Sequence, residues 1–66
     1  MIKDENGVMF VEICGEVRVR TTEAILLHDG IREEWVPLGQ VEDEETDKGI
    51  TTILIPEWLA VKKGFI

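Results

Sequence analysis

The chain has 66 residues, with 14 acidic against 7 basic side chains and a formal net charge of −7. A chain of this length forms one domain and buries only about 60% of the surface that it exposes when unfolded. Because the core is therefore small, a homo-oligomer would add buried apolar surface and stabilise the fold. The acidic balance argues against general nucleic-acid binding, which uses a basic face. It fits better with solubility, with a basic protein partner or with mimicry of the charge of a nucleic acid. The single cysteine excludes an internal disulfide.

The amino terminus "MIKDENGVMF" has acidic residues where a signal peptide needs an apolar core. No apolar run approaches the roughly 20 residues of a membrane span. We therefore expect a single cytoplasmic domain over residues 1–66 that has no contact with a membrane. Residues 1–7 are polar and end in "ENG", which predicts a flexible lead-in.

The first half of the chain predicts strands separated by turn signals. The stretch "VMFVEI" at 8–13 is β-branched and partly alternating, as in a half-buried strand. The glycine of "CGE" at 14–16 predicts either a turn or a bulge. The stretch "AILLH" at 24–28 is uniformly apolar, which is typical of a central strand, and "IREEWVP" at 31–37 is the returning strand.

Two local patterns predict the geometry of this half. The stretch "VRVR" at 17–20 alternates, so its valines should share one face of a strand and Arg18 and Arg20 the other. The pair Asp29-Gly30 predicts a tight hairpin, because both residues can take the positive φ of such a turn.

The second half begins with a long connection, "PLGQVEDEETDKG" at 37–49. Its acidic run should repel itself and stay solvated, which predicts an acidic interaction loop over 42–49. The acidic residues of this loop are Glu42, Asp43, Glu44, Glu45 and Asp47. The stretch "ITTILI" at 50–55 predicts the last strand.

The end of the chain, "IPEWLAVKKGFI", predicts a short helix over 56–63. Pro56 suits the first helical position, and the acid at the start and lysines at the end complement the helix dipole. Gly64 stands where a left-handed cap is needed, with Phe65 folding back on the last turn. Two helical turns are unstable alone in water, so Trp58 should face the core or an interface.

Five strands and one short carboxyl-terminal helix predict a mainly β fold. The sequence is compatible with two architectures. One is a small SH3-like or OB-like barrel, and the other is a curled antiparallel sheet with the helix packed on it.

The sequence contains no serine, and the residue types of catalysis are few. His28 stands beside the predicted turn without a nucleophile near it in the chain. Cys14 lies between Glu12 and Glu16, whereas a reactive thiolate needs an electropositive setting. These patterns predict a surface histidine, an inert thiol and a protein that is not an enzyme.

No metal site or cofactor is expected. The stretch "DEETDKG" resembles a calcium loop only loosely, since an EF-hand needs glycine at position 6 and glutamate at position 12. Counting from Asp43, these positions hold Lys48 and Leu54. A glycine-rich phosphate loop is also absent from the sequence.

The candidate binding residues are an aromatic and three arginines. Trp35 lies in "EEWVP", between charges and a turn, where a large ring is either buried in the core or anchors an interface. Arg18, Arg20 and Arg32 beside Trp35 would bind a nucleotide or single-stranded nucleic acid, with the base stacked on the indole and phosphate on guanidinium. The alternative is that the arginines pair with acids of neighbouring strands.

Two stretches, "GEVRVRTTEAILLHDGIREEWVPLGQVED" and "ITTILIPEWLAVKKGFI", carry a resemblance over roughly residues 11–66. They resemble small proteins encoded by bacteriophages and prophages that end in an "IPEWLAxKKG" segment. In that family a lysine, serine and glutamine follow the proline, whereas this chain has Leu38, Gly39 and Gln40. The departure removes a basic group, and Gln40 remains as a candidate binding residue.

The resemblance implies a phage accessory protein that acts in the cytoplasm of a bacterial host. We therefore expect a binding module without enzymatic activity that binds and modulates a host protein, such as a defence or replication factor. The alternative hypothesis, a nucleotide or single-strand binder, depends on the arginines and on Trp35.

Overall fold

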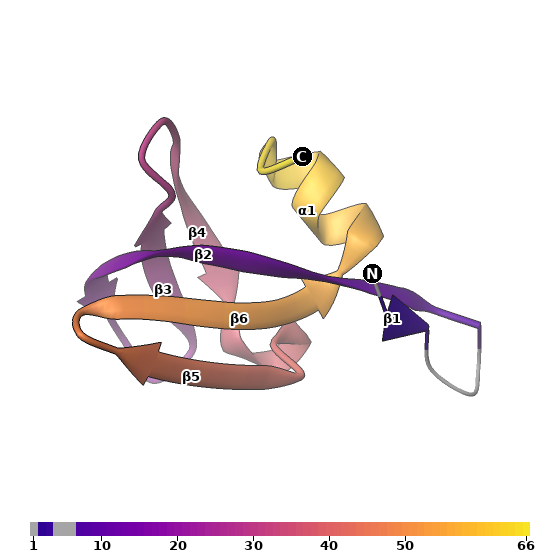
Figure 1. Cartoon of the computed structure of the whole chain (residues 1–66), viewed down its shortest axis with the longest axis horizontal. Helices are drawn as coiled ribbons and strands as arrows, with labels where there is room; N and C mark the ends of the chain where they lie inside the picture. Colours follow the sequence, from indigo (N-terminus) through magenta and orange to yellow (C-terminus); the bar gives the residue numbers. More distant parts are fainter. Residues whose placement is uncertain (1, 4–6) are drawn as a thin grey trace.

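The computed structural model describes residues 2–3 and 7–66. Its elements in chain order are β1 (Ile2–Lys3), β2 (Met9–Arg20), β3 (Ala24–His28), β4 (Glu33–Pro37), the 3-10 turn η1 (Leu38–Gln40), β5 (Asp43–Asp47), β6 (Ile50–Pro56) and α1 (Glu57–Lys63). All strands pair antiparallel in the order β4-β3-β2-β6-β5, and β1 adds to β2 (Figure 1). The predicted mainly β fold is confirmed, in the form of a curled sheet with a carboxyl-terminal helix.

Strand β2 belongs to both halves of the sheet, because it changes its partner midway. Up to Gly15 it pairs with β6, and from Glu16 onward it pairs with β3. Gly15 is buried, and a Cβ on it would stand 2.5 Å from the backbone oxygen of His28. The predicted break at 14–16 is therefore not a turn: the strand continues, and the glycine lets the two halves approach closely.

A bulge in β2 overturns the predicted faces of 17–20. Val17 pairs with Leu27 and Val19 with Leu26, so one extra residue, Arg18, lies between them. An extra residue reverses the side on which the following side chains point. Val17 therefore packs against the core, whereas Val19 is exposed.

The two hairpins are built differently from the prediction. The β3–β4 loop spans four residues, and of the pair Asp29-Gly30 only the glycine has positive φ. The β5–β6 turn instead has Lys48 at φ 53° and Gly49 at φ 83°. The tight hairpin with two left-handed residues is thus in the second half of the chain.

The predicted acidic loop over 42–49 is wrong, because Asp43–Asp47 forms the edge strand β5. Strand alternation sends neighbouring carboxylates to opposite sides, which separates their charges. An edge strand also tolerates charge, since its outer side faces water. The acidic run is therefore compatible with a strand.

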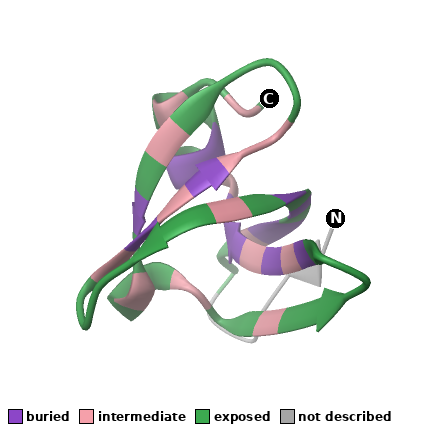
Figure 2. Ribbon diagram, turned by 90° about the vertical axis from the view of Figure 1, so that its left-hand side faces the viewer, coloured by how far each residue is buried: buried purple, intermediate pink, exposed green. Residues whose placement is uncertain are grey.

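The core lies between the two halves of the curled sheet and α1 (Figure 2). Its buried members are Val11, Ile13, Ile25, Leu27, Val36, Ile53, Ile55, Leu59 and Ala60. Alternate residues of β3 and β6 point inward, as expected for strands with one buried face. Neither tryptophan is among these residues: Trp35 is 43% exposed and Trp58 is 54% exposed. Core burial, one of the two predictions for each, is wrong.

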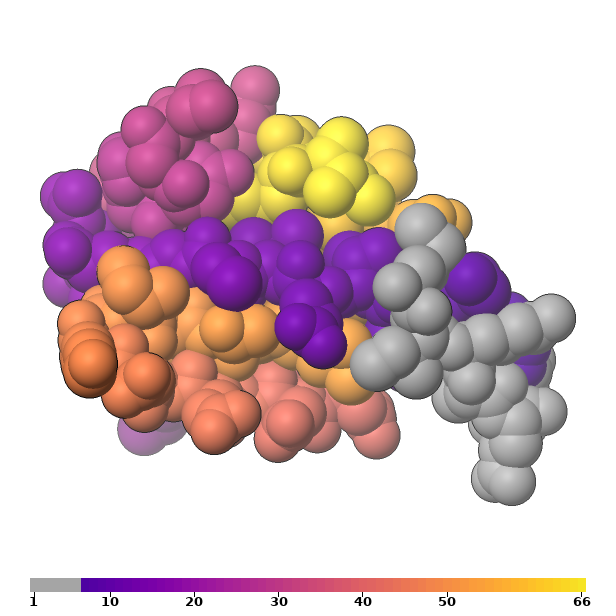
Figure 3. Space-filling view, viewed as in Figure 1, coloured from indigo at the N-terminus to yellow at the C-terminus, as the bar shows by residue number. Residues whose placement is uncertain are grey.

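The terminal helix has the predicted ending. Gly64 is left-handed at φ 81°; its N–H donates to the Val61 carbonyl, and that of Phe65 donates to Ala60. This is the Schellman arrangement. The side chain of Arg32 covers Gly64, so the end of α1 packs against the β3–β4 loop (Figure 3). Leu59 and Ala60 join α1 to the core.

Within the segment predicted as a flexible lead-in, Ile2–Lys3 pairs with β2 as strand β1. Residues 1 and 4–6 of that segment lie outside the described residues. In the described part of the chain, no helix is both long enough and apolar enough to cross a membrane.

Candidate functional site

An exposed row of apolar side chains crosses the outer face of β2, β3 and β4. Val19 is the cross-strand partner of Leu26, and Leu26 is the partner of Trp35. Directly paired side chains on one sheet face stand about 5 Å apart, so the three form one continuous apolar row. Val19 and Trp35 are both more than two-fifths exposed, at 44% and 43%.

The neighbours of the apolar row differ on its two sides. Toward the β3–β4 loop the next cross-strand row is polar, with Glu16 paired to His28 and His28 paired to Glu33. On the other side Ala24 is paired with Pro37. An apolar centre bordered by polar side chains, as on the side of the β3–β4 loop, is typical of a protein-binding patch.

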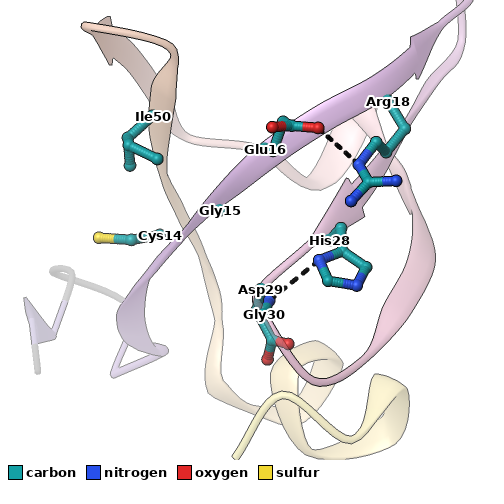
Figure 4. Close-up of a pocket in the computed structure, with 8 residues that line it drawn as sticks. All are labelled: Cys14, Gly15, Glu16, Arg18, His28, Asp29, Gly30 and Ile50. Carbon is teal, nitrogen blue, oxygen red and sulfur yellow. Dashed lines mark hydrogen bonds and ion pairs between the residues drawn. The ribbon is translucent and has the colours of Figure 1, made fainter.

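A pocket of about 390 Å³ opens at the bend of β2, beside the polar row. Figure 4 shows its lining: Cys14, Gly15, Glu16, Arg18, His28, Asp29, Gly30 and Ile50. Glu16 and Arg18 pair across it, with 2.6 Å between Oε1 and Nε. His28 accepts a hydrogen bond at Nδ1 from the Gly30 N–H, at 3.1 Å.

The polar groups of this pocket are engaged with one another or with the backbone. The Asp29 carboxylate accepts hydrogen bonds from the N–H groups of Arg32 and Ile31, at 2.7 and 2.9 Å, and these bonds hold its pKa below the usual range. The Cys14 side chain points away from His28 in Figure 4, and its Sγ lies 3.3 Å from the Thr52 hydroxyl. The lining therefore contains no thiol and imidazole arranged as nucleophile and base.

The three arginines of the predicted nucleotide site make ion pairs within the chain. Arg20 makes a bidentate pair with Glu44 of β5, and the hydrogen bond to Glu44 raises the pKa of the Arg20 guanidinium. Arg18 pairs with Glu16, and Arg32 lies 3.9 Å from a Glu34 oxygen. Each of the three predicted arginines thus has a carboxylate partner within the chain.

The outer face of the other half, formed by β2, β6 and β5, is acidic. Register places Glu12 beside Leu54 and Leu54 beside Asp43, while Glu45 is paired with Thr52 and Asp47 with Ile50. A groove of about 140 Å³ runs between them, lined by Glu12, Asp43, Glu45, Thr52 and Leu54. We call Glu12, Asp43, Glu45 and Asp47 the acidic face. The strands β2, β6 and β5 that carry it lie side by side in Figure 3.

The predicted acidic residues are therefore divided. Asp43, Glu45 and Asp47 belong to the acidic face, whereas Glu44 pairs with Ile53 on the inner side and binds Arg20. Glu42 precedes the strand and donates its N–H to the Leu54 carbonyl at 2.8 Å. Gln40 is exposed at the end of η1, the connection from β4 to β5.

Sequence reasoning missed Val19 and Leu26 as partners of Trp35. The bulge that exposes Val19 has no clear sequence signal. The outward direction of Trp35 does have one, because in "EEWVP" it shares the period-2 face with Glu33 and Pro37, whereas Val36 falls on the buried face.

No group of three or more His, Cys, Asp or Glu side chains suited to a metal ion occurs among residues 2–3 and 7–66. Comparison with protein-family models, with curated proteins and with solved structures gives no match to this chain.

Proposed function

We propose that the chain is a protein-binding module without enzymatic activity, and that its partner docks on the apolar row of Val19, Leu26 and Trp35. The observation that carries this proposal is a half-exposed tryptophan in a continuous apolar row on a sheet face. Tryptophan is enriched among the residues that dominate binding energy, because its ring covers a large area with few rotatable bonds. The polar row of Glu16, His28 and Glu33 would form the rim of this interface.

The charge of the molecule supports a basic partner. The net charge is −7, and four of the carboxylates that produce it lie together in the acidic face on the second half of the sheet. A field of one sign attracts an oppositely charged protein over about a Debye length and raises the rate of association. The apolar row would then supply most of the affinity and the charge most of the steering.

The resemblance to phage and prophage proteins extends the proposal to a biological setting. We propose a partner in the cytoplasm of a bacterial host, a defence or replication factor whose activity the module changes. The alternative, a nucleotide or single-strand binder, has less support because Arg18, Arg20 and Arg32 already pair with carboxylates.

The test is affinity capture from host lysate with three tagged proteins: the wild type, Trp35→Ala and Trp58→Ala. Trp58 is a matched control, since it is also an exposed tryptophan, at 54% against 43% for Trp35, and lies outside the apolar row. We expect the wild type and Trp58→Ala to retain a stoichiometric protein that Trp35→Ala loses. Truncating a central tryptophan of an interface typically weakens binding by about 2 kcal/mol or more, roughly thirtyfold.

Nuclease treatment of the same lysate separates the two hypotheses. A partner that survives nuclease and depends on Trp35 supports the module. Recovery of nucleic acid would contradict it, as would a partner that both tryptophan variants retain.

A further inference from the structure

Strand β4 is the edge of the sheet, and its backbone has a defined free side. Among the described residues the strand order ends at β4. Two hydrogen bonds bracket its ladder with β3: Asp29 N–H to the Arg32 carbonyl at 3.0 Å, and Leu38 N–H to the Glu23 carbonyl at 2.8 Å. Both pairs continue the register in which Leu26 is opposite Trp35.

Antiparallel ladders alternate between pairs that exchange hydrogen bonds and pairs that do not. Because the two bracketing pairs are hydrogen-bonded, the alternation places the N–H and carbonyl groups of Glu34 and Val36 toward β3. The groups of Glu33, Trp35 and Pro37 face outward. Pro37 has no N–H, and its outward position costs β3 no hydrogen bond. The edge thus offers the N–H and carbonyl groups of Glu33 and Trp35. The carbonyl of Pro37, the N-cap of η1, already accepts the first hydrogen bond of that turn and offers only its second lone pair.

We propose that a second copy of the chain pairs with this edge, β4 against β4 in antiparallel orientation, with Trp35 opposite Trp35 of the second copy. In this register each Trp35 N–H meets the other Trp35 carbonyl, and each Glu33 N–H meets the second lone pair of the other Pro37 carbonyl. The two-fold axis makes the interface self-complementary, as in most homodimers. This inference goes beyond the proposed function, since it requires no other partner.

The charges of β4 favour this register over its neighbours. Pairing centred on Glu33 would oppose Glu33 to its own copy, and pairing centred on Glu34 would do the same for Glu34. Like charges directly opposite are destabilising in a sheet. Pairing centred on Val36 would place Pro37, which has no N–H, opposite Trp35. The Trp35-centred register opposes Glu33 to Pro37 and Glu34 to Val36, so no like charges meet and more donors are used.

This pairing would also join the two apolar rows. Val19, Leu26 and Trp35 of one copy would continue into Trp35, Leu26 and Val19 of the other across a single sheet. The contact is one short strand per copy, which is below the size of a standard stable interface. The dimer should therefore be weak and concentration-dependent. Because each copy carries a net charge of −7, added salt should strengthen it.

The experiment is sedimentation equilibrium of the wild type from about 10 µM to about 1 mM, the range in which weak dimers are populated. Two variants perturb the edge. Glu33→Pro removes an outward N–H and no hydrogen bond to β3, and Trp35→Lys brings like charges together at the two-fold axis. We expect both to weaken dimerisation about tenfold or more, and the control Trp58→Ala to leave it unchanged.

A second readout keeps the test independent of the folding of the variants. In the wild type, the amide protons of Glu33 and Trp35 should exchange more slowly at high protein concentration, and those of the opposite edge, Glu44 and Thr46, should not change. A wild type that stays monomeric up to about 1 mM would overturn the proposal. So would a dimer that Trp58→Ala abolishes, or protection that appears at β5 instead of β4. None of these outcomes tests the docking of a host partner on the apolar row.

Discussion

The two halves of the sheet share strand β2 and yet have opposite outer faces. On the half made with β3 and β4, the centre of the face is the apolar row of Val19, Leu26 and Trp35. On the half made with β6 and β5, it is the acidic face around Leu54 and Thr52. A single small sheet thus presents an apolar surface and a negatively charged surface.

The difference arises within β2 rather than at a domain boundary. At Gly15 the strand passes from β6 to β3, and the bulge at Arg18 then reverses its faces. Without the bulge, Val19 would point into the core and the apolar row would lack its third member. The contrast between the two faces therefore depends on one glycine and one inserted residue.

The largest expected effect comes from Gly15→Val, which removes the close approach between the halves. Its Cβ would stand 2.5 Å from the His28 carbonyl oxygen. The position of the Cβ is fixed by the backbone of β2 and that of the oxygen by the backbone of β3, and the two strands are paired. Overpacking of this kind typically costs 1–3 kcal/mol, and we expect about 3 kcal/mol or more here because no flexible side chain can move away. Urea denaturation monitored by tryptophan fluorescence measures the change.

Gly39→Ala is the control for this prediction. Gly39 lies in η1, and a Cβ there would meet nothing within 4 Å. We expect its free energy of unfolding to stay within about 0.5 kcal/mol of the wild type. Equal effects of the two substitutions would mean that the close approach at Gly15 does not hold the halves together.

The sequence predicted the elements that depend on local patterns. The runs at 24–28 and 50–55 alternate or are uniformly apolar between turn residues, and both are strands. The helix ending was predictable for a similar reason, since Gly64 and the lysines before it have local roles.

The parts that could not be predicted depend on distant partners. The acidic run forms β5 because β6 is beside it, and its composition alone indicates a solvated loop. The bulge at Arg18 appears only when β2 is aligned with β3. The partner of Arg20, Glu44, comes from a strand far away in sequence. The sequence therefore shows the residue types of the predicted nucleotide site, but not that Arg20 is paired with a carboxylate of a distant strand.

An intermediate effect is expected at Gly64, which connects the two halves through the helix. α1 continues directly from β6, and its cap lies under Arg32 of the β3–β4 loop. A β-branched residue resists the left-handed φ of 81°, so Gly64→Val should lower the free energy of unfolding by about 1 kcal/mol or more. The long Arg32 side chain can move, so most of this cost should come from the backbone.

Gly64→Asn tests that assignment, because asparagine adds a Cβ but tolerates the left-handed region. It should lose less stability than Gly64→Val in the same denaturation experiment. If the two variants are equally destabilised, contact with Arg32 rather than the backbone conformation determines the cost.

The smallest expected effect is a difference between the two hairpins in their response to acid. The β3–β4 loop depends on a carboxylate, since Asp29 accepts hydrogen bonds from Arg32 and Ile31 and its pKa is lowered mainly by the first of these. The β5–β6 turn takes its shape from the left-handed Lys48 and Gly49. A lowered pKa means that the contribution of Asp29 is fully present above the ordinary carboxyl value of about 3.9 and is lost as the pH falls through the lower folded value.

Acid should therefore loosen the β3–β4 loop at a pH where the β5–β6 turn is still formed. The measurement is an NMR titration from about pH 6 to about pH 2, following the amide protons of Ile31 and Arg32 against that of Gly49. The first two should shift together with a midpoint below about 3.9, and Asp29→Asn, which keeps an oxygen acceptor but does not titrate, should abolish that midpoint. If the amide signal of Gly49 shifts with the same midpoint, protonation of Asp29 affects both hairpins. The two halves of the sheet would then respond to acid as one unit.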